Sequence, residues 1–282
     1  MSSKRVTRSK YGNAISFFFL ALMGVFIALP IYYSIINAFK PVSELFLFPP
    51  RFVVYHPTFE NFKNIIRLQS QSTIAVERYI FNSVTVTVIA TAGYILIASL
   101  AAYPMAKKEF PGKKIISVVI VFAILFSADV TELPRYMMMS KFGMLDTYWA
   151  ILLPAMAGSF GVFLMIQFMS GIPNDILEAA NIDGSNEIQT FFYIIMPSVK
   201  PALFTLTIFT FIATWPLSGS QFTYSESLKM LPTMLAQLNS GGISRTGVAA
   251  AGTVIMMLPS IIVFLICQGS VIETMTYSGI KG

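Results

Sequence analysis

Six long apolar stretches alternate with shorter polar segments along this chain. Each stretch runs for roughly 20 residues, the length that an α-helix needs to cross the hydrocarbon core of a bilayer. Because that core offers no water to backbone N–H and C=O groups, each crossing segment is expected to be a helix. The sequence therefore predicts an all-α transmembrane bundle with six spans, at about residues 14–38, 80–103, 115–136, 149–169, 202–219 and 248–268.

Composition agrees with a membrane protein. Of the 282 residues, 55% are hydrophobic and only 11% are charged, and the mean hydropathy is +0.71. Soluble domains usually carry about 25% charged residues. The net charge of +6 does not indicate nucleic-acid binding, because the basic residues cluster beside the apolar stretches. The single cysteine, Cys267, excludes an internal disulfide and gives no basis for a metal site.

Lysine and arginine positions indicate which side of the membrane each connection faces. Basic residues are dense in the N-terminal segment 1–13 and in the short connection 107–114. Because cytoplasmic connections are enriched in such residues, both segments are expected inside the cell. Six spans then place both termini, and the polar insert at 170–201, in the cytoplasm. The first stretch is too long for a signal-peptide core, so residues 14–74 are expected to form a retained first transmembrane helix and an outer loop.

The spans contain no charged residue that must lie inside the membrane. Ion-coupled carriers and proton pumps usually need such a residue, so this absence argues against them. The metalloprotease, serine-hydrolase and phosphate-binding loop motifs are absent too. The chain alone is therefore expected not to be an enzyme.

Neutral polar residues in or near the spans suit a path for a neutral, hydroxyl-rich solute better than one for an ion. The candidate residues are Asn82, Tyr94, Trp215 and Gln221. For each of them, a hydrogen bond to a neighbouring helix is the competing interpretation. The indole of Trp215 can stack on a sugar ring, but a tryptophan at this position is equally typical of a membrane interface.

The polar insert has the pattern of a short helix followed by a second segment. Pro173 suits the first turn of a helix, and Asp175 favours the positive end of the helix dipole. Gly184 is placed to end the helix in a left-handed conformation. The small side chains of Ala179 and Ala180 are expected to be exposed, so that this helix can fit the groove of a partner.

This insert resembles the EAA motif of ABC importer permeases, which is Glu-Ala-Ala, three residues, Gly, nine residues, Ile, one residue, Leu, Pro. The matching residues are Glu178, Ala179, Ala180, Gly184, Ile194, Met196 and Pro197, with Asp183 before the glycine. Met196 in place of leucine is the one departure. A motif this long, in the connection between the fourth and fifth spans, is specific.

Further segments resemble the MalG-like branch of carbohydrate importers. The run from Lys141 to Trp149 is similar to a signature of that branch, Asn82-Ser83 resembles the opening of its second span, and the tail from Tyr277 to Gly282 is also similar. The branch often has Trp-Asn-x-Phe late in its fifth span. Here Trp215 is followed by Pro216 and Leu217 instead, which weakens substrate contacts inferred from that region.

The resemblance implies one permease subunit of a sugar or oligosaccharide ABC importer in the bacterial cytoplasmic (inner) membrane. The permease core is then residues 75–282, with the EAA loop at 170–201. Implied partners are a second, MalF-like permease, a dimer of ABC ATPases and an extracytoplasmic solute-binding protein. ATP and Mg²⁺ belong to the ATPase, and no cofactor is expected in this chain.

Residue roles also follow from the resemblance. Glu178 and Asp183 are expected to make polar contacts at the rim of the ATPase, and Ala179 and Ala180 to fill its groove. Gly184 is expected to set the turn after the helix, with Pro197 marking the return to the membrane.

Three alternatives remain at the level of the sequence. The chain can belong to an ABC importer of another solute, such as an amino acid, a peptide or phosphate. It can be an ion-coupled secondary carrier, which the missing intramembrane charge argues against. It can also be an intramembrane enzyme, for which no catalytic set is found.

Overall fold

The computed structural model describes residues 10–69, 74–126 and 128–278. The chain forms two compact units. The first comprises residues up to Leu68 together with Gln237–Ile255, and the second comprises Gln69–Ala236 together with the residues from Met256 onward. The long C-terminal helix α14 (Thr246–Ser278) begins in the first unit and continues in the second.

The first unit is built around α1 (Lys10–Phe39), α2 (Val42–Leu45) and α3 (Glu60–Gln69), with the single turn Ile243–Arg245 before α14. Asn61 is 3% exposed, and its amide donates to the carbonyl oxygens of Ala38 (2.9 Å) and Lys40 (2.8 Å). These bonds satisfy carbonyl groups where α1 ends, which otherwise have no partner in the helix. The predicted outer loop after the first span therefore contains two helices that its scattered charges did not suggest.

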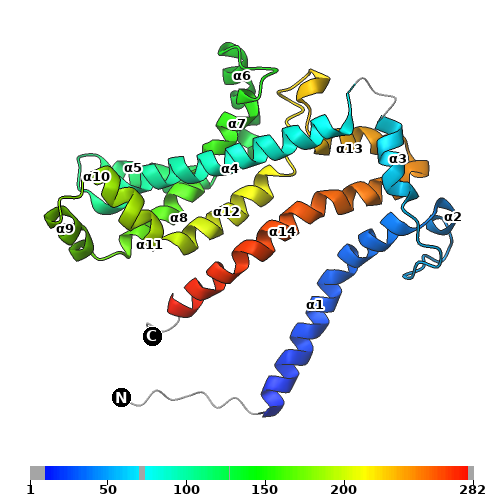
Figure 1. Cartoon of the computed structure of the whole chain (residues 1–282), viewed down its shortest axis with the longest axis horizontal. Coiled ribbons are helices and arrows are strands. Elements are labelled where there is room, and N and C mark those ends of the chain that lie inside the picture. Colours follow the sequence, from blue (N-terminus) through cyan, green and yellow to red (C-terminus); the bar gives the residue numbers. More distant parts are fainter. Residues whose placement is uncertain (1–9, 70–73, 127, 279–282) are drawn as a thin grey trace. The chain divides into compact units, whose positions relative to one another are not determined.

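The second unit packs α8 (Ser159–Ser170) and α12 (Lys200–Thr214) along α4 (Val76–Lys107), with α7 (Trp149–Met156) ahead of α8 (Figure 1). Small residues on α4 allow this close packing, since Ala90, Ala98 and Ala102 are at most 1% exposed. The core between these helices joins residues of all three to the polar insert: Ala98, Ala102, Met165, Met169, Phe191, Ile195, Ala202 and Leu206.

Other elements of this unit lie near the two ends of α4 (Figure 1). Near its C-terminal end are α5 (Lys113–Ile124), α9 (Asn174–Ile182), α10 (Glu187–Gln189), a π-helix (Thr190–Ile195) and α11 (Met196–Ser198). Near its N-terminal end are the turn Glu226–Leu228 and α13 (Leu231–Asn239), whose last residues belong to the first unit, and α6 (Ala128–Lys141) lies beside α7.

Among the described residues, four helical segments are long and apolar enough to span a membrane: Tyr11–Phe39, Val76–Lys107, Trp149–Ser170 and Thr246–Gly269. The pair Glu187–Ser198 and Lys200–Thr214, bent by 77°, makes a fifth candidate.

The predicted third span at 115–136 is wrong as one helix. α5 has 12 residues, so it is about 18 Å long, short of a bilayer crossing of about 30 Å. α6 then carries Glu132, Pro134 and Arg135, which are costly in lipid.

Candidate functional site

The polar insert forms a short helix with well-defined ends. Asp175 lies in the first turn of α9, as the sequence predicted, whereas Pro173 directly precedes the helix with extended backbone angles instead of lying in its first turn. At the other end, Gly184 has φ = +82°, the left-handed conformation that glycine adopts most readily. Its N–H donates to the Asn181 carbonyl at 3.1 Å, and the Ser185 N–H donates to the Ala180 carbonyl at 3.0 Å. Both bonds of a Schellman termination are therefore present.

The next helix begins three residues after Gly184 with a capping box. The Asn186 side chain accepts from the Gln189 N–H at 2.8 Å, and the Gln189 side chain accepts from the Asn186 N–H at 3.0 Å. The pattern Asn-x-x-Gln is a start signal that can be recognised in the sequence. The Schellman motif that ends α9 and the capping box that begins α10 together fix the backbone over residues 183–186. The two helices therefore have a defined orientation relative to each other.

The two faces of α9 differ sharply. Ala180 is 4% exposed, and Leu177, three positions earlier, packs against the core of the second unit. The expectation that Ala180 is exposed is therefore wrong, because residues three apart share one face of a helix and this face turns inward. The expectation holds for Ala179, which is exposed.

The opposite face of α9 presents Glu178, Ala179, Ile182 and Asp183 to the outside, and we call these four residues the α9 outer face. Ile182 is 86% exposed, twice the fraction of Ile176 (43%) on the same helix. The sequence does not single out Ile182, since an isoleucine in a helix is typical of a core position. Pro197, by contrast, lies at the start of α11, away from this face, and is exposed.

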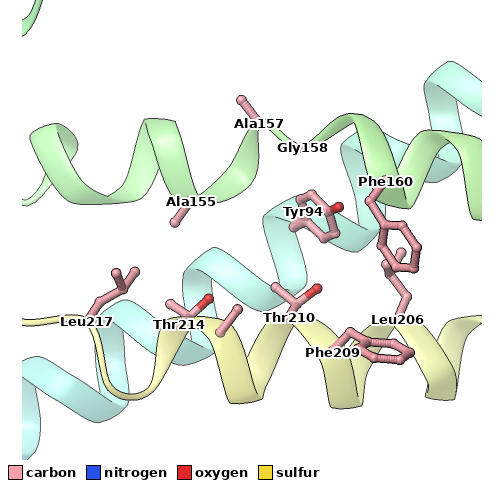
Figure 2. A pocket seen from close by; sticks show the side chains of 11 residues that line it. Tyr94, Ala155, Ala157, Gly158, Phe160, Leu206, Phe209, Thr210, Thr214 and Leu217 are labelled. Atoms are coloured by element: carbon pink, nitrogen blue, oxygen red, sulfur yellow. The ribbon is translucent and has the colours of Figure 1, made fainter. Parts of the chain in front are cut away.

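A second candidate site is a pocket of about 430 Å³ between α4, α7, α8 and α12 (Figure 2). Tyr94 belongs to α4, and its side chain lies at the break between α7 and α8. Its hydroxyl accepts the Gly161 N–H at 2.7 Å. Thr210 and Thr214 on α12 contribute hydroxyl groups, and Phe160 and Phe209 contribute ring surface. Within the described part of the chain, Thr210 Oγ1 is buried without a hydrogen-bond partner. The pocket thus combines aromatic walls with hydroxyl groups and has no charged lining residue.

Asn82, the next predicted path residue, is engaged elsewhere. Its amide donates to the carbonyl oxygens of Ser227 (2.8 Å) and Lys229 (2.9 Å) and accepts from the Tyr148 hydroxyl (2.8 Å). It is 0% exposed. Its polar atoms therefore tie the segment around residues 226–231 to α4, which matches the competing interpretation of a hydrogen bond between elements.

Trp215 is also engaged within the chain. Its indole N–H donates to the Met256 carbonyl at 2.9 Å, and its ring stacks on Phe211 with centroids 5.8 Å apart. At 4% exposure it is a buried residue, so neither sugar stacking nor an interfacial position describes it. Gln221 lies in the connection after α12 and is exposed. Of the four predicted path residues, only Tyr94 lines the pocket.

Comparison with known proteins agrees with this architecture. Residues 114–272 match the family model of the binding-protein-dependent transport system inner membrane component. The arabinooligosaccharides transport system permease protein AraQ of Halalkalibacterium halodurans is 27% identical over 95% of both chains. The trehalose/maltose transport system permease protein MalG of Thermococcus litoralis is 28% identical over 93% of this chain and 94% of its own.

The fold is that of a solved importer component. A chain in the crystal structure of a bacterial ABC transporter involved in the import of the acidic polysaccharide alginate superposes with a TM-score of 0.77. The match covers 93% of this chain and 98% of that chain, at 22% identity, so it shows the fold alone. Because the family model covers more than half of the residues, this chain belongs to the family of binding-protein-dependent transport system inner membrane components, and it is a membrane transport subunit.

Proposed function

We propose that this chain forms half of the transmembrane pathway of an ATP-driven importer for a sugar or oligosaccharide. A second, MalF-like permease supplies the other half, a dimer of ABC ATPases binds ATP and Mg²⁺, and an extracytoplasmic solute-binding protein delivers the solute. The chain lies in the bacterial inner membrane with both termini in the cytoplasm. The names of the relatives AraQ and MalG, both permeases for saccharides, support the solute class.

The observation that carries the proposal is the α9 outer face. This face places an isoleucine that is 86% exposed between the carboxylates of Glu178 and Asp183, and an apolar centre with a polar rim suits a docking surface. The fixed ends of α9 hold that surface rigidly, so a force on it reaches the core through Leu177 and Ala180. The proposed occupant is the ATPase, with Ile182 as the apolar anchor and with Glu178 and Asp183 at the rim.

The solute path is proposed to pass the pocket at Tyr94 rather than Asn82 or Trp215. Hydroxyl groups of Thr210 and Thr214 beside aromatic rings suit a polyhydroxylated solute, and a pocket without charged side chains favours a neutral one over a uronate. Gln221 remains a proposed contact at the outer end of the path.

The test is to replace Ile182 by aspartate in the assembled importer. Ile182→Asp places a charge in the proposed interface, so co-purification of the ATPase and solute-stimulated ATP hydrolysis should each fall about tenfold or more. The matched control is Val53→Asp, which makes the same kind of change at a side chain that is 58% exposed in the predicted outer loop. It should leave ATPase binding unchanged. Wild-type hydrolysis and binding in Ile182→Asp would refute the docking role of α9.

A further inference from the structure

The C-terminal end of α4 contacts both ends of the α9–α10 segment. Lys107 Nζ donates to the Ile172 carbonyl, just before α9, and to Asn174 Oδ1 at 3.3 Å, in its first turn. Lys108 forms an ion pair with Glu187, the first residue of α10. Lys107 therefore contacts the beginning of α9 and Lys108 contacts the beginning of α10, although both helices are more than 60 residues away in sequence.

Glu187 is the centre of the second contact. One carboxylate oxygen accepts from Lys108, and the other accepts from the Tyr103 hydroxyl at 2.9 Å. Its place in the first turn of α10 also puts its charge at the positive end of that helix. Hydrogen bonds and the charge of Lys108 hold the pKa of Glu187 below its ordinary value, so the carboxylate is ionised at neutral pH. We call Tyr103, Lys107, Lys108 and Glu187 the α4 brace.

A single exposed ion pair contributes little to folding stability. The side chains of Lys108 and Glu187 are 48% and 58% exposed, so the brace is not explained by stability. What these contacts determine is position, because a pocket lies between α9 and the end of α4 and leaves the helix without full apolar support there. Lys107 and Glu187 line this pocket together with Glu178, which therefore stands at the edge of the α9 outer face. Without the brace, α9 is held to the unit chiefly by Leu177, Ala180 and its chain ends.

We propose that the α4 brace makes α9, α10 and the end of α4 move as one body, so that motion of the docked ATPase is transmitted to α4 as well as to α12. Tyr103, Lys107, Lys108 and Glu187 are positioning residues in this proposal. It rests on the proposed docking of the ATPase on α9, and it adds a second route by which that docking reaches the membrane helices.

The experiment exchanges the charges of one contact in the reconstituted importer. Lys108→Glu and Glu187→Lys each place like charges opposite one another, so sugar uptake per ATP hydrolysed should fall about fivefold while the ATPase still co-purifies. The double variant restores an attractive pair. It should transport at least about twofold better than the worse single variant. Tyr103→Phe, which removes only the hydroxyl, should cause a smaller loss of the same kind.

The matched control is Glu109→Lys, which makes the same charge change in the same connection. Glu109 is 91% exposed and pairs with Lys113 rather than with the α9–α10 segment, so uptake per ATP should be unchanged. Unchanged coupling in the single variants, or a double variant no better than the worse single one, would overturn the brace. If the proposed function itself were wrong, the wild-type importer would show no ATP-dependent uptake at all. That outcome is distinct from the loss of the brace alone.

Discussion

At the scale of single residues, two glycines make room for Tyr94. A Cβ atom at Gly158 or Gly161 would lie 2.3 Å or 2.7 Å from atoms of the Tyr94 ring. Such distances are shorter than real contacts, so the glycines are needed where the ring enters the break between α7 and α8. The sequence showed an aromatic residue amid small ones in the second span, but it did not show that the matching glycines lie just before α8 and in its first turn.

The first prediction follows from this fit. Gly161→Ala should destabilise the protein by about 1–3 kcal/mol, because the ring of Tyr94 is buried and must shift. Gly171→Ala is the control, since its added Cβ would meet only the Phe168 carbonyl oxygen at 3.4 Å. Thermal unfolding of both variants in detergent measures the difference. Equal melting temperatures for the two would contradict the fit.

Asp146 is a second residue with a defined local role. It has φ = 58°, and its carboxylate accepts the N–H groups of Tyr224 (2.9 Å) and Ser225 (2.8 Å) as well as the Ser225 hydroxyl. These bonds, with the Ser225 hydroxyl first, hold the pKa of Asp146 below its ordinary value. The residue thereby fastens the connection after α6 to the segment after α12.

The second prediction uses the sign of that shift. A lowered pKa stabilises the fold above the unfolded-state value of about 3.9, and the contribution is lost as the pH falls through the folded-state value. Asp146→Ala should therefore lower the melting temperature at pH 5 to 8, and the gap to wild type should shrink below about pH 4. Asp146→Asn keeps an acceptor oxygen and tolerates the positive φ, so its loss should be smaller. A gap that widens in acid would contradict this account.

At the scale of elements, the sequence predicted most where local chemistry decides the structure. Asp175, Gly184 and the spacing between them predicted α9 and its end, and both are confirmed. The sequence did not predict features that depend on tertiary packing. The burial of Ala180 depends on which face of α9 meets the core, and the engagement of Asn82 and Trp215 depends on carbonyl groups more than 40 residues away. The division of the third apolar stretch is a local case instead, because Glu132, Pro134 and Arg135 of α6 are visible in the sequence and are costly in lipid.

The third prediction concerns the end of α9. Proline fixes φ near −65°, so Gly184→Pro cannot adopt the observed +82° and should reduce uptake about tenfold or more by misplacing the α9 outer face. Gly184→Asn is the control, since asparagine visits this conformation and a Cβ here meets nothing within 4 Å. Membrane levels of the two variants should be similar. A Gly184→Pro variant that transports normally would show that the geometry of this turn is not required.

At the scale of the whole molecule, the proposed topology places the two ends of α4 on opposite sides of the membrane. The basic connection 107–114 adjoins the C-terminal end of α4. The segment 226–229, a few residues after Gln221, is hydrogen-bonded to Arg78, Tyr79 and Asn82 near the N-terminal end. The fourth prediction is that a cysteine at Gln221 reacts with a membrane-impermeant maleimide in intact spheroplasts. A cysteine at Glu109 should react only after lysis.

Both positions are exposed, so access to the side chain is not limiting. The only native cysteine, Cys267, is buried, and its replacement by serine removes any background. The opposite labelling pattern would invert the topology and would place the α9 outer face on the wrong side of the membrane for an ATPase.

The bend of 77° between Glu187–Ser198 and Lys200–Thr214 has a mechanical consequence. Two stiff helical segments joined at nearly a right angle change the direction of a motion that passes through the bend. A displacement of the shorter segment, α10 through α11, along its axis would tilt α12 sideways. It would not shift α12 along the axis of α12. α12 carries Thr210 and Thr214, so a small thrust at the surface would sweep two pocket-lining hydroxyl groups across the path and leave the depth of the helix in the bilayer nearly unchanged.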